Sequence, residues 1–149
     1  MLTDLDLVGI EEIKQLKARY WRAVDMRDFQ LLRSVFTADC VVDFRDAMLE
    51  RDETKLWPDP DKFCEDTKLA TRGIITVHHG FPPEISVTSE QEAEGIWPFE
   101  DLVWVNEPNP LLPFKQLRGY GHYREKYRKT TAGWKIQSMY ISRLHMEIE

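Results

Sequence analysis

The chain has 149 residues, the size of a single domain, and its 42% content of hydrophobic residues is sufficient for one core. A net charge of -6 provides no basic surplus for phosphate contacts, so nucleic acid is not an expected partner. No apolar run is long enough to cross a bilayer and the N-terminus lacks the pattern of a signal peptide, so the sequence predicts a cytoplasmic protein without a membrane partner.

The first half of the chain carries helical patterns. Apolar residues recur at helical spacing over about 4–26, which predicts a long amphipathic helix. Asp28 is placed to cap a second, shorter helix, and ADCVVDF (38–44) is typical of a short strand. The pair Asp59-Pro60 supplies an N-cap and a first-turn proline for a third helix, which should end near Gly73.

In the second half the period of the pattern changes to two, which predicts strands. The segment TTAGW (130–134) is typical of a hairpin turn in which Gly133 takes a positive φ. The expected strands lie near residues 74–79, 84–89, 92–106, 114–129 and 133–147.

Two long connections lie between these elements, at 45–58 and 106–113. The first is charged and irregular, and the second carries three prolines, which cannot donate to a strand ladder and so lie outside the sheet. Both are longer than the usual connection. They could rim a pocket, pack against a neighbouring subunit or have no special role.

Helices followed by an antiparallel sheet predict an α+β fold, made of one domain over residues 1–149. A strongly curved sheet whose open side is covered by the N-terminal helices would form a cone that encloses one deep pocket. The chain holds five Trp, five Tyr and seven Phe, so a core or a pocket can be lined with rings.

The sequence contains no glycine-rich phosphate loop, no G-x-S-x-G and no H-E-x-x-H. Cys40 and Cys64 form no C-x-x-C pair and have no metal-ligand spacing, so we interpret them as free thiols. We therefore expect neither a metal nor another cofactor. The remaining chemistry is acid–base catalysis by histidine, carboxylate and tyrosine groups, which can take a proton from carbon and give one to a leaving hydroxyl.

Two candidates for such chemistry lie on the first predicted helix. Asp25 is near its C-terminal end, where the helix dipole disfavours a carboxylate. It is either a functional group or a solvated residue at a helix end. Tyr20, five residues earlier, diverges from Asp25 by about 140° on a regular helix. It therefore flanks the same pocket only if the pocket wraps around the helix end, and it is otherwise a core residue.

The segment VHHGFPPE contains two of the four histidines. In a strand, His78 and His79 point to opposite faces, so one pocket can receive only one of them. Alternation does not decide between them, because each shares its face with apolar residues and Gly80 could mark a bulge. His122 lies in a later predicted strand and could reach a pocket, whereas His145 lies close to the C-terminus.

Four segments together resemble a known family. They are IKQLKARYWRAVDMRDFQLLRSVFTADCVVDF, VHHGFPPEISV, AEGIWPFEDLVWV and YGHYREKYRKTTAGWKI, in this order. They are similar to the SnoaL-like branch of the nuclear transport factor 2-like (NTF2-like) superfamily, and within it to bile acid 7α-dehydratases, scytalone dehydratase and hexachlorocyclohexane dehydrochlorinases. The resemblance implies a cone-shaped fold, an elimination reaction and a homotrimer or homodimer.

The resemblance extends to individual residues. The K-x-x-Y-x-x-x-x-D pattern of the dehydratases matches Lys17, Tyr20 and Asp25, and their catalytic histidine matches His78. The same histidine and aspartate match the elimination dyad of the dehydrochlorinases. The aspartate of an E-D pair in the dehydratases matches Asp101. The resemblance thus implies that His78 is the base, that Asp25 orients it and that Tyr20 donates to a carbonyl oxygen.

The implied pocket would hold a small hydrophobic substrate that contains a ring. One tyrosine of the dehydratase pocket is replaced here by Phe44, so a hydroxyl is missing. The residues expected to bind the substrate are Trp21, Phe44, Trp97, Phe99 and His122.

The hypothesis from the sequence is a dehydratase that needs no cofactor and eliminates water from a cyclic or polycyclic hydroxy-carbonyl compound through an enolate-like intermediate. The proton for the leaving hydroxyl would come from His78 or from Asp101. An isomerase of the ketosteroid type and a polyketide cyclase are alternatives that use similar groups. A further alternative is a non-catalytic module for ligand binding or oligomerisation, in which the cone would be filled and His78 and Asp25 would lie far apart.

Overall fold

The computed structural model describes all residues from Met1 to Glu149. It confirms the predicted order of helices and strands, except that Leu56–Trp57, within the segment predicted to be irregular, forms a short strand. Strands dominate from residue 74 onward, as the change of period indicates. The elements are α1 (Asp4–Asp25), α2 (Phe29–Ser34), β1 (Phe36–Asp43), β2 (Leu56–Trp57), α3 (Pro60–Ala70), β3 (Ile74–Gly80), β4 (Glu84–Val87), β5 (Glu92–Val105), β6 (Gln116–Thr130) and β7 (Gly133–Ile148).

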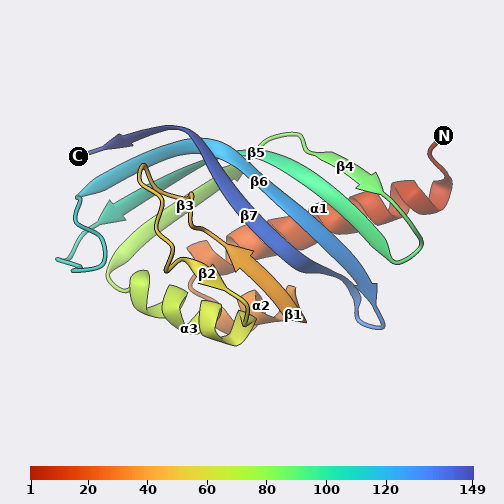
Figure 1. Cartoon of the computed structure of the whole chain (residues 1–149), viewed down its shortest axis with the longest axis horizontal. Coiled ribbons are helices and arrows are strands. Elements are labelled where there is room, and N and C mark those ends of the chain that lie inside the picture. Colours follow the sequence, from red (N-terminus) through yellow and green to blue (C-terminus); the bar gives the residue numbers. More distant parts are fainter.

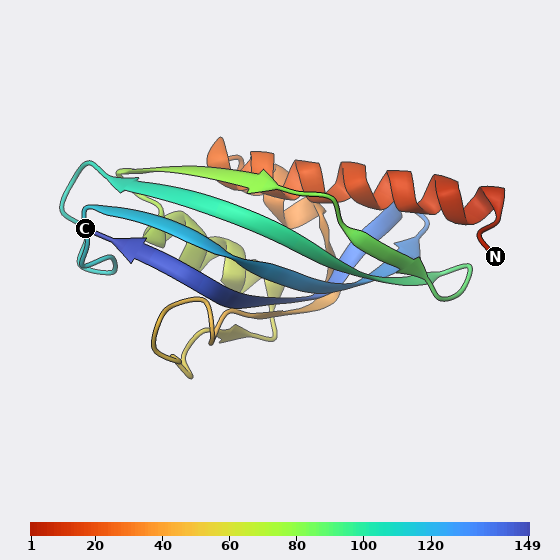
Figure 2. The same cartoon turned by 90° about the horizontal axis from the view of Figure 1, so that it is seen from above.

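The strands form one sheet of seven strands in the order β2-β1-β7-β6-β5-β3, and β4 also pairs with β5. All neighbouring strands are antiparallel except β1 and β7, which run parallel. The sheet is curved but does not close, and α1 and α3 lie on its concave side (Figures 1 and 2). This is the expected α+β arrangement, with the helices covering the open side of the sheet.

Local signals explain where the helices begin and end. The Thr3 hydroxyl accepts from the Asp6 backbone N–H while the Asp6 carboxylate accepts from the Thr3 backbone N–H, which is a capping box for α1. Asp28 caps α2 and Asp59 caps α3. Beyond the end of α3, Gly73 has a φ of 71°, a conformation that favours glycine.

The connections between the strands follow the predicted turn chemistry. Gly133 has a φ of 95° in the tight hairpin between β6 and β7. Gly80 ends β3 for a different reason, because a Cβ atom at this position would lie 2.1 Å from the Trp21 ring. Only a glycine lets the indole of Trp21, on α1, lie directly against this end of β3.

The core lies between the helices and the concave face of the sheet. Its centre is a cluster of aromatic rings in edge contact, with centroid distances such as 4.6 Å for Phe99 and Tyr123 and 5.5 Å for Trp21 and Trp97. These rings fill part of the space inside the curved sheet where the sequence analysis predicted a deep pocket. Two surface hollows lie between the loop around Met48 and the C-terminal half of β7, and Arg143 lines one of them.

Cys40 and Cys64 are free and buried, as predicted. Burial raises the pKa of the Cys40 thiol to about 12 and that of Cys64 to about 11, so both behave as small core residues. None of the helices is both long enough and apolar enough to cross a membrane.

Candidate functional site

Asp25 and His78 meet where the end of α1 crosses β3. The Nδ1 atom of His78 lies 2.6 Å from Oδ1 of Asp25, and the backbone N–H of His78 donates to Oδ2 at 2.9 Å. The Thr76 hydroxyl also donates to Oδ1, at 2.9 Å. Three donors from one strand therefore hold the Asp25 carboxylate, and that carboxylate in turn fixes the imidazole ring.

The two adjacent histidines have different surroundings. Thr76 and His78 are two residues apart on β3 and share the face toward α1, where 10% of the His78 side chain is exposed. His79 points to the other face, where its Nδ1 lies 2.8 Å from Oε1 of Glu100 and 55% of its side chain is exposed. His78 is therefore the histidine on the concave side, and His79 is a surface residue.

Asp101 is the direct neighbour of His78 across the β3–β5 ladder. Both of its carboxylate oxygens accept from the guanidinium of Arg143 on β7, at 2.7 and 2.9 Å. The guanidinium crosses β6 at Gly119, where a Cβ atom would lie 2.4 Å from both Arg143 and Asp101. Sequence reasoning missed Arg143, although a glycine within a long strand is a known signal of such close approach.

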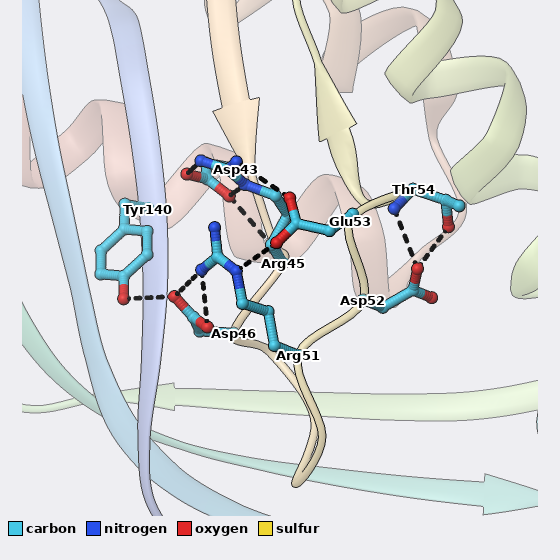
Figure 3. A network of polar contacts seen from close by, with 8 residues as sticks. All are labelled: Asp43, Arg45, Asp46, Arg51, Asp52, Glu53, Thr54 and Tyr140. Atoms are coloured by element: carbon cyan, nitrogen blue, oxygen red, sulfur yellow. Dashed lines mark hydrogen bonds and ion pairs between the residues drawn. The ribbon is translucent and has the colours of Figure 1, made fainter.

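Arg143 also contacts the loop that follows β1. Its Nε donates to the Ala47 carbonyl at 2.8 Å. The Tyr140 hydroxyl, also on β7, donates to Asp46 of the same loop at 2.8 Å (Figure 3). Two residues of β7, Tyr140 and Arg143, therefore attach the loop to the strand.

Ion pairs stabilise the loop from within (Figure 3). Arg45 donates to both oxygens of Asp43, at 2.8 and 2.9 Å, and Arg51 donates to both oxygens of Asp46, at 2.9 Å. Glu53 accepts from both arginines and joins the two pairs. Single exposed ion pairs contribute little, but a connected network gives this charged segment a defined shape.

Two tyrosines occupy the concave face beside the histidine. Tyr20 from α1 and Tyr123 from β6 are in edge contact, with centroids 6.0 Å apart, and both are almost fully buried. Burial raises the pKa of both phenols. The neighbouring Tyr123 phenol raises the pKa of Tyr20 further, and the Asp101 carboxylate raises that of Tyr123. Both phenols therefore stay protonated and able to donate. Sequence reasoning did not single out Tyr123.

The predicted lining residues divide into two groups. Trp21, Trp97 and Phe99 are at least 93% buried in the aromatic cluster, and Phe44 packs against its edge. His122 lies on the opposite face of β6, because its neighbour Tyr123 points into the core. The structure therefore brings the four aromatic residues together but does not bring His122 to them.

No three His, Cys, Asp or Glu side chains gather closely enough to hold a metal ion. The charged groups on the concave face are instead paired with one another, as in Asp25 with His78 and Asp101 with Arg143. The arrangement consists of an imidazole with a carboxylate partner, phenol donors and a second carboxylate whose oxygens are occupied. Such a set can remove, hold and return a proton.

The family model described as "SnoaL-like domain" matches residues 6–140. This chain belongs to that family. The match covers both the helix that carries Asp25 and the strand that carries His78.

Similar solved structures share the fold of this SnoaL-like protein. A candidate scytalone dehydratase from Novosphingobium aromaticivorans has a TM-score of 0.84 at 19% identity, covering 99% of this chain and 92% of the other. A hexachlorocyclohexane dehydrochlorinase of type 2 has a TM-score of 0.80 at 17% identity, covering 99% and 93%. A candidate aromatic ring hydroxylase from N. aromaticivorans has a TM-score of 0.82 at 17% identity, covering 96% and 94%. At these identities the similarity establishes the fold, on which different reactions occur.

Proposed function

We propose that this SnoaL-like protein is a lyase of the dehydratase type that acts on a small cyclic hydroxy-carbonyl compound. The observation that carries the proposal is the 2.6 Å contact between His78 and Asp25 on the concave face. The non-catalytic alternative predicts that His78 and Asp25 lie far apart, whereas the two side chains are in hydrogen-bond contact. The dehydratase and dehydrochlorinase among the similar structures support an elimination chemistry.

In the proposed reaction, His78 removes a proton from the carbon next to the substrate carbonyl. The electrons of the broken C–H bond form an enolate, whose oxygen accepts a hydrogen bond from the Tyr20 hydroxyl. Asp25, bound to Nδ1, keeps Nε2 free to act as the base and stabilises the imidazolium that results. The enolate then re-forms the carbonyl and expels the hydroxyl from the β carbon, which leaves as water.

The proton for the leaving hydroxyl is proposed to come from His78. Asp101 was the other candidate, but both of its oxygens already accept hydrogen bonds from Arg143. An acceptor in this position can orient a hydroxyl but has no proton to give. One imidazole thus removes and returns the same proton, and no net proton is consumed. The substrate loses one H from carbon and one OH, and the products are an enone and water.

The test is elimination from simple cyclic β-hydroxy ketones, beginning with 3-hydroxycyclohexanone, followed by the ultraviolet absorbance of the enone and by product mass. His78→Ala should lower the rate by about 10²- to 10⁴-fold, the usual contribution of a general base. His79→Ala is the matched control and should retain the wild-type rate. Equal rates for His78→Ala and wild type would contradict the proposal, and a product of unchanged mass would indicate an isomerase instead.

A further inference from the structure

A fully buried ion pair lies against the two tyrosines of the proposed site. The Nζ atom of Lys17 is 2.7 Å from Oε1 of Glu125, and neither side chain has any exposed surface. Neither the ammonium nor the carboxylate has another hydrogen-bond partner. Lys17 lies on α1 three residues before Tyr20, and Glu125 lies on β6 two residues after Tyr123. Each charge therefore shares its element and its face with one tyrosine.

Aromatic rings enclose the ammonium group. Its Nζ is 3.5 Å from the ring centroid of Tyr123, 4.2 Å from that of Tyr20 and 4.7 Å from that of Trp21. A cation at such distances is attracted by the ring faces, most strongly where water is excluded. Lys17 thus contacts both tyrosines at once, and Glu125 ties it to β6. The pair fixes the position of one phenol relative to the other.

Burying this ion pair in the core has a free-energy cost, because both charges lose their contact with water. Burial lowers the pKa of Lys17 to about 8 and raises the pKa of Glu125, which means that the interior disfavours both charges. Replacing a buried ion pair by apolar residues of similar volume is often neutral or stabilising. Stability alone therefore gives no reason for charges here, whereas a defined position for Tyr20 and Tyr123 does.

We propose that Lys17 and Glu125 are positioning residues that direct the hydroxyls of Tyr20 and Tyr123 toward one substrate oxygen. The two phenols then donate together to the oxygen of the developing enolate. The Lys17 ammonium contacts the faces of both rings and keeps them in position. Neither charge touches the substrate, so both act through the tyrosines. This inference rests on the proposed function. It identifies Tyr20 and Tyr123 as the residues of the same site that bind the substrate oxygen.

The test compares the double variant Lys17→Met/Glu125→Leu with wild type. The replacements are apolar and similar in volume, and the double variant leaves no unpaired charge. The control is Asp39→Asn/Arg128→Met, which removes an exposed ion pair between β1 and β6. For each variant, thermal unfolding reports stability, and steady-state kinetics on the cyclic β-hydroxy ketone separate kcat from KM.

We expect the Lys17→Met/Glu125→Leu variant to fold with a Tm no lower than that of wild type. Its kcat should fall by about 10- to 100-fold, because donors displaced by a fraction of an ångström no longer match the transition state. Its KM should change little, and the control should keep the wild-type kcat. A fall in kcat without a fall in Tm would not result from a merely structural role.

The outcomes separate this inference from the proposed function. If His78→Ala is inactive and the double variant has the wild-type kcat, the inference is wrong and the dehydratase proposal stands. If His78→Ala is as active as wild type, the proposed function itself fails. Binding of 2-naphthol, an aromatic alcohol that mimics an enolate, gives a readout that does not need turnover. We expect the double variant to bind it at least about ten-fold more weakly, and equal affinity would overturn the inference.

Discussion

His78 and Asp101 are Cα partners on neighbouring strands, so their side chains leave the sheet on the same face. The end of α1 brings Asp25 to the first of them and β7 brings Arg143 to the second. An imidazole–carboxylate pair and a guanidinium–carboxylate pair therefore lie side by side on the concave surface. In the first pair the ring has one free nitrogen, whereas in the second both carboxylate oxygens are occupied.

The contact with Asp25 predicts the tautomer of His78. Because Nδ1 faces the carboxylate at 2.6 Å, the neutral ring should carry its proton on Nδ1 and leave Nε2 as the acceptor. Nitrogen NMR of labelled protein distinguishes the two ring nitrogens by their chemical shifts. In Asp25→Asn the preference should weaken, and the elimination rate should fall by about 10²-fold or more. A protonated Nε2 in the neutral wild-type ring would show that His78 is not poised as a base.

The Asp101–Arg143 pair predicts a large loss of stability when one partner is removed. The two side chains are 9% and 10% exposed, so Arg143→Met leaves a nearly buried carboxylate without its donors. Breaking a buried pair in this way costs about 3–5 kcal/mol. Urea unfolding should show this loss, and Arg143→Lys should recover only part of it because an ammonium cannot donate to both oxygens in the same geometry.

The double variant Asp101→Leu/Arg143→Met is the control for that experiment. It removes both charges, so it should be more stable than Arg143→Met alone if the loss comes from an unpaired carboxylate. Equal stabilities of the two variants would instead indicate that Arg143 acts mainly by packing over Phe99, whose ring centroid lies 5.1 Å from the guanidinium.

Local signals in the sequence predicted the elements of the fold well. The caps Asp28 and Asp59 and the turn residue Gly133 each act within a few neighbours, and each lies where the pattern placed it. The choice between His78 and His79 was different, because alternation states only that they point to opposite faces. Which histidine faces α1 depends on how the helix crosses β3, and this packing is part of the tertiary structure, which alternation does not predict.

The candidate site residues that the sequence did not predict have partners that are distant along the chain. Arg143 is 42 residues from Asp101, and no local pattern connects them. Tyr123 meets Tyr20 only because α1 lies across β6. His122 illustrates the converse, since a histidine in a strand next to a buried tyrosine must point to the other face. Strand parity excludes it from the concave side once the inward residue is known.

The glycines on α1 and β3 predict opposite effects of the same substitution. Gly80→Ala places a methyl group 2.1 Å from the Trp21 ring, so the ring or the end of β3 must move, at a cost of about 1–3 kcal/mol. Gly9→Ala meets only ordinary contacts at 3.6 Å or more, and a helix gains up to about 1 kcal/mol from this change. In denaturant unfolding, the free energy of unfolding should therefore be highest for Gly9→Ala, intermediate for wild type and lowest for Gly80→Ala. A Gly80→Ala protein as stable as wild type would mean that Trp21 moves freely.

The buried tyrosines predict a loss of stability in alkali. Burial raises the pKa of Tyr20, Tyr123 and Tyr127, so these phenols keep their protons in the folded protein at a pH where the unfolded chain has lost them. The folded state then binds more protons, and its stability falls as the pH rises above about 10. Each tyrosine contributes up to about 1.4 kcal/mol per pH unit.

Lys17 acts in the opposite direction, and Tyr127→Phe isolates the tyrosine effect from it. Because the pKa of Lys17 is lowered to about 8, unfolding takes up a proton from about pH 8 to 10.5, which raises stability over that range. Wild type and Tyr127→Phe share this contribution, so the difference between their urea unfolding curves removes it.

Tyr127→Phe also leaves the Trp97 indole N–H without its acceptor, but this cost is independent of pH. Above about pH 10 the stability of Tyr127→Phe should therefore fall less steeply than that of wild type, and parallel slopes would show that Tyr127 ionises in the folded protein as it does in the unfolded chain.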